Sequence, residues 1–365
     1  MMAGMGAEVI KIEAPKNQDP VRVSPPFIGD RSALDLMLNR SKECLALDVR
    51  PPEGKAVFLE MLKEADVLIE SFRPGVMAKA GLDYNSIKHI NPRLIYVSIS
   101  GFGQNGPYAG KAGHDINYTA YTGVTALNGT KTSGPIVPAN QQADVSGAYA
   151  TMNATLAALL ARHRTGEGQH VDVSLLDGLL PMMSMQLAHH QAFDPPPGRG
   201  ETMLAGGLAG YGIFRCRDDR YIVLGALEPK FWLAFCQAAG KPEWEPRHFD
   251  LGERKNQLVA ELNQFFAQRS RDAWLEYFKD EDFCLSPVLE PEELADDPQI
   301  KARKMIRVDE SGVNYIATPG VFSHTPNSPE LEHTAKPGAH TNVILKEMGL
   351  DEQQIADLRD KGIIL

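Results

Sequence analysis

The chain has 365 residues, of which 43% are hydrophobic and 23% charged, and its formal net charge is −10. This composition is that of a folded globular protein, and the length favours two domains. No basic run marks a nucleic-acid surface and no stretch of about 18 apolar residues occurs, so we expect neither a polynucleotide nor a membrane partner. The four scattered cysteines lack CxxC spacing, which indicates reduced thiols and a cytoplasmic location.

Short apolar runs alternate with helical patterns in the first hundred residues. Strands are expected in 7–15, at the start of 43–54, in 66–75 and in 93–103, with a helix after the proline pair at 51–52. Apolar runs between helices indicate buried parallel strands, so the predicted fold class is α/β. Ligands bind such sheets at the carboxyl ends of the strands.

Three cations follow these predicted strand ends, namely Arg50, Arg73 and Lys79. One alone is a solvated surface charge. Three that converge at the same edge of a sheet would bind a polyphosphate, because Arg is shaped for bidentate phosphate contact.

The middle of the chain is helical. A long Ala-rich helix is expected to start at Asp144, followed by a strand at His170–Val173 and a second helix. The Met- and Leu-rich residues 179–187 are expected to be helix core; the alternative is a flexible wall for an acyl chain. Residues 191–212, rich in Pro and Gly, form a predicted linker.

The remaining elements are predicted from 212 onward. Two strands flank the Asp-Asp turn at 218–219, helices run through 229–306, strands return at 312–323, and the tail forms one or two short helices.

Three ionisable positions are candidates for chemistry. His114, beside Asp115 in "AGHDINY", is either a proton carrier or a capping residue. Asp144 is expected to be a helix N-cap, and a carboxylate there stays ionised and can act as base or nucleophile. Glu228, in "GALEP", is expected at a strand-to-helix junction, where an acid either caps the helix or takes part in the reaction.

Other chemistries find no support in the residue spacing. The histidines lack HxxxH or HExxH spacing, so no metal is predicted. "GFGQNG" at 101–106 has glycines without the dinucleotide or P-loop spacing, which argues against NAD and nucleoside triphosphates.

Taken together, these strings resemble the family III CoA-transferases (CaiB/BaiF) and, within them, the α-methylacyl-CoA racemases. The resemblance runs through "GAEVIKIEAP", "NPRLIYVSISGFGQNGPY", "AGHDINY", "RTGEGQHVDVSLLDG", "GALEP" and "HTNVILKEMGL", in that order. The subclass rests on "AGHDINY" with "GALEP", since the transferases typically lack that His.

The resemblance implies roles for particular residues. His114 matches the base on one face of the substrate, Asp144 the base on the other face, and Glu228 the acid that orients the histidine; Asp115 is counted with them. The positions that match those holding the CoA moiety are Leu47, Asp48, Val49, Arg50, Arg73, Lys79, Gly113, Ile116, Asn117 and Tyr118. CoA enters as part of the substrate, and no prosthetic group is implied.

The resemblance also implies an architecture. A large Rossmann-like domain is expected from 1–190 and 318–365, a smaller α+β domain from 213–305, and linkers at 191–212 and 306–317. Two chains are expected to interlock as rings in a homodimer. About twenty residues that normally precede "GAEVIKIE" are expected to be missing here.

Three functions remain open at this stage. The first is racemisation of 2-methylacyl-CoA thioesters by two bases through an enolate. The second is CoA transfer with Asp144 as nucleophile, through acyl-enzyme and aspartyl-CoA intermediates. The third is binding of a CoA thioester without turnover. Because a thioester carbonyl carries enolate charge, two bases of unlike pKa on opposite faces suit the first.

Overall fold

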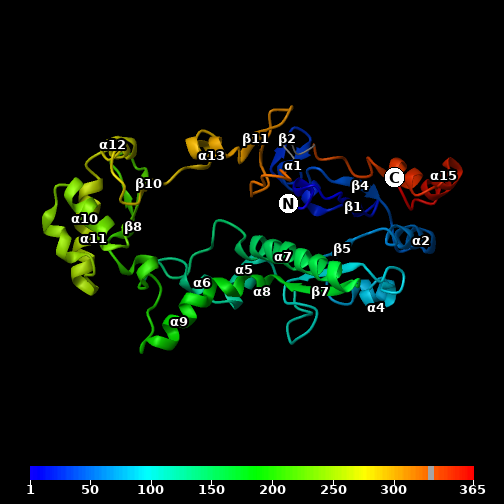
Figure 1. Ribbon diagram of the computed structural model, residues 1–365, viewed down its shortest axis with the longest axis horizontal. Helices are drawn as coiled ribbons and strands as arrows, with labels where there is room; N and C mark the ends of the chain where they lie inside the picture. Colours follow the sequence, from blue (N-terminus) through cyan, green and yellow to red (C-terminus); the bar gives the residue numbers. More distant parts are fainter. Residues whose placement is uncertain (328–332) are drawn as a thin grey trace. The chain divides into compact units, whose positions relative to one another are not determined.

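The computed structural model describes residues 1–327 and 333–365, which form two compact units (Figure 1). Unit 1 comprises Met1–Gly110, Ala150–Val173 and Glu292–Leu365, and unit 2 comprises Lys111–Tyr149 and Ser174–Pro291. The boundaries of these two units differ from the boundaries predicted for the two domains. The predicted domain ranges stay a prediction, and part of the 318–365 range, residues 328–332, lies outside the described residues.

Unit 1 contains strands from both ends of the chain. Its strands are β1 (Ile10–Glu13), β2 (Phe27–Ile28), β3 (Arg31–Ser32), β4 (Glu43–Ala46), β5 (Val67–Glu70), β6 (Ile95–Ser100), β7 (Gln169–Ser174), β11 (Ile306–Val308) and β12 (Asn314–Ile316). Its helices are α1 (Ala33–Leu38), α2 (Pro52–Met61), α3 (Val76–Ala80), α4 (Tyr84–Ile87), α13 (Pro298–Arg303), α14 (Thr341–Glu347) and α15 (Glu352–Asp360).

Unit 2 is mainly helical. Its strands are β8 (Tyr211–Arg215), β9 (Tyr221–Gly225) and β10 (Leu285–Pro287). Its helices are α5 (Asp115–Tyr121), α6 (Val124–Leu127), α8 (Leu175–Leu179), α9 (Ser184–Ala192), α10 (Pro229–Ala238), α11 (Gly252–Phe266) and α12 (Arg271–Tyr277). The long helix α7 (Gln142–Thr165) starts in unit 2 and ends in unit 1.

Parallel pairing confirms the predicted α/β class. β1 pairs in parallel with β4, and β5 pairs in parallel with β6, in a sheet of order β5-β6-β7. The predicted strands thus form where expected, and α2 starts at the proline pair, where the fixed φ of proline suits the first helical turn.

One expectation about the sheets is wrong. β4 and β5 belong to separate sheets, so Arg50 and Arg73, which follow them, do not lie at the edge of one sheet. The short β1-β4 pair is instead completed by the C-terminal tail, since Leu47 bridges to Ile364 and the amide of Asp48 bonds Ile363.

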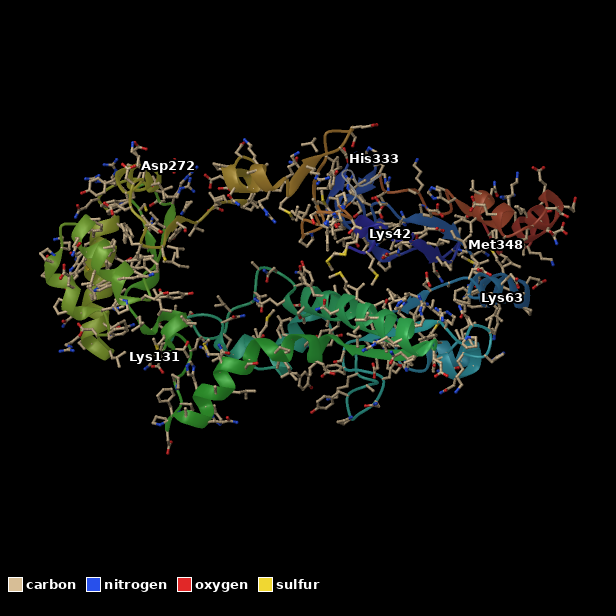
Figure 2. All side chains as sticks on the ribbon, viewed as in Figure 1. Lys42, Lys63, Lys131, Asp272, His333 and Met348 are labelled. Atoms are coloured by element: carbon tan, nitrogen blue, oxygen red, sulfur yellow. The ribbon has the colours of Figure 1, made fainter. Side chains whose placement is uncertain are left out.

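The core of unit 1 packs the tail against β4. Leu45 and Leu47 are buried with residues of α2, α14 and α15, and Met348 packs on the same cluster (Figure 2). In a second cluster, Ala154 and Ala158 of α7 lie against Val97 of β6, because small residues let the helix approach the sheet closely.

The segment 209–283 of unit 2 has its own aromatic core. The antiparallel β8-β9 hairpin turns at Asp219, as predicted, and α10, α11 and α12 lie near it (Figure 1). Trp232, Phe266 and Trp274, from these three helices, are buried in the shared core. The strand at 285–287 was not predicted, since it pairs with β9 inside a stretch expected to be helical, and the short strands β2, β3 and β11 were not predicted either.

The helix-core interpretation of residues 179–187 is wrong. Leu179 is buried, but the following turn and α9 bury none of their residues, and Met182 is 57% exposed. An apolar stripe at helical spacing looks the same in sequence whether its own chain or another molecule covers it.

Candidate active site

The turn at 113–118 presents His114 at the start of a short helix. His114 is the N-cap residue of α5, in extended conformation, and its backbone N–H donates to Asn117 Oδ1 at 3.0 Å. The Tyr118 hydroxyl donates to the Gly113 carbonyl at 2.8 Å, and a Cβ at Gly113 would lie 2.8 Å from the Tyr118 ring. Gly113, Asn117 and Tyr118 therefore order the turn, and the His114 residue is exposed.

Asp115 connects α5 to the start of α7. Its Oδ1 accepts the backbone N–H of Ala143 at 2.6 Å and that of Asp144 at 3.1 Å. Both donors belong to the first turn of α7, where helix N–H groups have no partner inside the helix. Asp115 thus caps a helix that is distant in the sequence.

Asp144 is therefore not the N-cap that the sequence predicts. α7 starts at Gln142, which places Asp144 within its first turn. The pKa of Asp144 is raised above its ordinary value, first by burial and then by the negative charge of Asp115. The charge of His114 lowers the pKa of Asp144 and so opposes these two effects.

These side chains line one cleft of about 360 Å³. His114, Asp115 and Asp144 contribute its ionisable groups, and Ile116, Val137 and Pro138 contribute an apolar wall; Asn140 and Gln141 complete the lining. The cleft is of the size that holds a small organic group, with few polar groups and an apolar side. The structure thus brings together the two residues expected to act as bases.

Backbone donors also belong to the residues around this cleft. At the start of α7 the N–H groups of Gln142 and Val145 bond to the carbonyls of residues 140 and 141, and those of Ala143 and Asp144, between them, bond to Asp115. These four N–H groups therefore already have partners within the protein. Among the described residues, the N–H groups of Asp115 and Ile116, at the start of α5, have no partner.

Glu228 lies at the predicted strand-to-helix junction. It is the N-cap residue of α10, after β9, but its side chain makes no capping hydrogen bond and the residue is exposed. Within the described part of the chain it forms no hydrogen bond or ion pair with His114. Its orienting role stays a prediction.

The other residues predicted to hold CoA lie in unit 1. Leu47 is buried, and Arg50 forms an ion pair with Asp48 at 2.6 Å. Arg73 and Lys79 are exposed and, among the described residues, have no carboxylate partner. Val49, which lies between the two partners of this ion pair in the sequence, packs partly against the core of unit 1.

Sequence reasoning missed the segment 137–141 that closes the cleft. Val137 is 73% exposed, and Pro138, Asn140 and Gln141 carry no motif. The one available signal was an apolar pair, Ile136 and Val137, exposed between two prolines.

Comparison with known proteins identifies the family. The pattern of "CoA-transferase family III" matches residues 1–341. The chain belongs to this family. It is 32% identical to the human α-methylacyl-CoA racemase, with all of this chain and 92% of that protein covered. It is 33% identical to the acetyl-CoA:oxalate CoA-transferase of Acetobacter aceti, with 91% and 88% covered.

A solved structure supports the same family. The CAIB/BAIF family protein from Brucella suis has a TM-score of 0.83 and 31% identity, over 95% of this chain and 93% of that one. The relatives include both racemases and transferases at similar identity, so the family implies an enzyme that acts on CoA compounds without deciding between the two reactions.

Two further findings concern the described residues only. None of their helices is both long and apolar enough to cross a membrane. They contain no group of three or more His, Cys, Asp or Glu side chains placed to hold a metal ion.

Proposed function

We propose that the protein racemises 2-methylacyl-CoA thioesters by moving the α-proton through an enolate. The observation that carries the proposal is that His114 and Asp144 line one cleft, with the pKa of Asp144 raised. A two-base racemase needs one base free and the other protonated, and a raised carboxyl pKa brings the two groups closer in proton affinity.

The residues have distinct parts in the proposed reaction. His114 removes the α-proton from one face, and the electron pair moves onto the thioester oxygen. Protonated Asp144 then delivers its proton to the other face, the enolate collapses, and the proton on His114 balances the one that Asp144 has lost. The opposite enantiomer takes the reverse path. No redox partner or prosthetic group enters this balance.

The enolate oxygen is placed at the start of α5 in this proposal. The N–H groups of Asp115 and Ile116 are unpaired among the described residues and belong to cleft-lining residues. Preorganised backbone donors aimed at a developing oxyanion lower the barrier in many enzymes. The acyl group would lie along Val137 and Pro138, and the exposed cations Arg73 and Lys79 are the proposed CoA phosphate ligands.

Solvent-deuterium wash-in tests the proposal. Either enantiomer of a 2-methylacyl-CoA, incubated with the protein in D₂O, is expected to gain deuterium at the α-carbon and to racemise. His114→Gln and Asp144→Asn should each abolish racemisation. The folded protein binding CoA without incorporating any label would refute the proposal.

The alternative is a CoA-transferase, favoured by the 33% identity to the oxalate transferase. Asp144 would then attack the thioester carbonyl, expelling CoA thiolate and forming a mixed anhydride; the thiolate would next attack the aspartyl carbonyl and release the acyl carboxylate. Hydroxylamine trapping of Asp144 would favour this reaction, and His114→Gln would then be tolerated. If the protein binds CoA but shows neither deuterium wash-in nor trapping by hydroxylamine, the remaining function is binding of a CoA thioester without turnover.

We further propose the interlocked homodimer, with a Rossmann-like fold for the larger domain and a cytoplasmic location. The proposal of a dimer is supported by the apolar surface that is exposed on two helical regions. The exposed apolar residues are Val145, Tyr149, Leu156 and Leu160 on α7 and Met182, Met185, Leu187 and Phe193 on and around α9. Sedimentation should give twice the 40.0 kDa mass of the chain; a monomer at micromolar concentration would contradict it.

A further inference from the structure

We propose that Asp115 is a positioning residue and transfers no proton itself: its carboxylate closes the N-terminus of α7 and holds the backbone of Asp144 in place at the cleft. This inference rests on the proposed racemase function. It assigns to Asp115 a role separate from those of His114 and Asp144, with which it was grouped.

The geometry gives the first step of the argument. One oxygen of Asp115, Oδ1, accepts both the Ala143 and the Asp144 N–H groups, at 2.6 and 3.1 Å. These two contacts commit that oxygen to the backbone of α7, where helix N–H groups have no partner inside the helix. The contacts also fix the backbone of Asp144, since its own N–H is one of the two donors.

The charge on Asp115 gives the second step. It faces Asp144 and raises the pKa of that carboxyl, after burial as the larger cause, while His114 lowers it. The cleft segment 137–141 carries no titratable side chain, and α8, which packs against α5, carries Asp177. Besides burial, the two charges that act on the pKa of Asp144 in opposite directions thus come from one short turn.

Separating the charge from the hydrogen bonds tests this assignment. Asp115→Asn keeps an acceptor oxygen for the helix but removes the charge, whereas Asp115→Ala removes both. The matched control is Asp351, which caps α15 by accepting the Gln354 N–H at 2.8 Å and lines no part of the cleft. Asp351→Asn and Asp351→Ala remove the same groups from a helix cap elsewhere.

The pH profile of wash-in is the main readout. The proposed reaction needs one proton shared between His114 and Asp144. The acidic limb of the pH profile therefore reports the ionisation of Asp144, and both Asp115 variants should move this limb to lower pH. Asp115→Asn should keep most of the plateau rate, whereas Asp115→Ala should lower it by about 10- to 100-fold through misplacement of Asp144. The amides of Ala143 and Asp144 should exchange hydrogen faster in Asp115→Ala. The Asp351 variants should change none of these.

Three results would overturn the inference. They are an acidic limb that stays in place in Asp115→Asn, unchanged amide exchange in Asp115→Ala, or loss of activity in Asp115→Asn at every pH as in Asp144→Asn. If the unmodified protein shows no wash-in, the proposed function fails instead. The carbon-13 carboxyl titration of Asp144, with and without Asp115→Asn, then decides the inference: a lower pKa supports it and an unchanged pKa overturns it.

Discussion

Two Asp→Asn substitutions should change stability in opposite directions at neutral pH. The pKa of Asp144 is raised in the folded protein, so its ionised form costs stability above that pKa. The pKa of Asp309 is lowered far below its ordinary value: burial acts against this, but hydrogen bonds from Ser311 and Arg40 and the charge of Arg40 outweigh it. Ionised Asp309 therefore adds stability above pH 3.8, the ordinary value.

The structure sets the two magnitudes. Asp144 is partly open to water, so Asp144→Asn should stabilise the protein at pH 7 by less than about 1 kcal/mol, the range of exposed charge interactions. Asp309 and its partner Arg40 are buried, with 6% and 1% of their side chains exposed. Breaking a buried pair on one side costs about 3–5 kcal/mol, so Asp309→Asn should destabilise by about 3 kcal/mol.

Urea unfolding at several pH values between 4 and 8 measures both effects. The gain from Asp144→Asn should shrink as the pH falls towards 3.8, because the carboxyl then takes up its proton in folded and unfolded protein alike. The deficit of Asp309→Asn should be constant from pH 8 down to about 5 and begin to shrink only nearer its ordinary pKa. A loss of stability in Asp144→Asn at pH 7 would refute the argument that this carboxylate is held at a cost.

Four further substitutions test the fold and the proposed dimer. Arg22→Met should cost about 3–5 kcal/mol in urea unfolding, because it leaves the buried Glu13 carboxylate without its guanidinium, whereas Asp35 keeps that of Arg31. A change below about 1 kcal/mol would contradict this ion pairing. Gly54→Ala places a Cβ 1.9 Å from the Asp48 carbonyl oxygen and should lower the free energy of unfolding by at least about 1–3 kcal/mol. A Cβ at Gly110 has no atom within 4 Å, so Gly110→Ala should leave the free energy of unfolding unchanged in the same assay. Met185→Glu should leave monomer stability within about 0.5 kcal/mol but weaken the proposed dimer in sedimentation; an unchanged dimer would remove α9 from the interface.

The strands and most helices could be predicted from sequence because their signals are local. In the strands that end at Glu13, Ala46 and Glu70, apolar residues either alternate with polar ones or form a continuous run, as is typical of strands, and glycine and proline follow them. The tertiary arrangement could not be predicted in this way. The separate sheets of β4 and β5, and the exposed face of α9, depend on which segments pair, and residue type does not encode that.

The candidate site was predicted in part for the same reason. His114 and Asp144 are distinctive residue types in distinctive strings, and they do share a cleft. The cap of α7 comes from Asp115, 29 residues before Asp144, so no local pattern could reveal that the helix starts earlier than the acid. The neutral segment 137–141 carried no chemical signal at all.

That cap explains why a helix start and a raised pKa occur at one residue. The N-terminal turn of a helix favours a negative charge, and an acid there is expected to ionise readily. Here the free N–H groups of the turn are satisfied by Asp115, so the helix stabilises the charge of that residue in place of Asp144. Asp144 is left beside a carboxylate and partly removed from water, and both conditions favour its protonated form. A nucleophile for CoA transfer would benefit from the reverse arrangement, with the helix N–H groups directed at Asp144 itself. In the proposed reaction, this distribution of hydrogen bonds between two neighbouring acids suits proton transfer at the cleft.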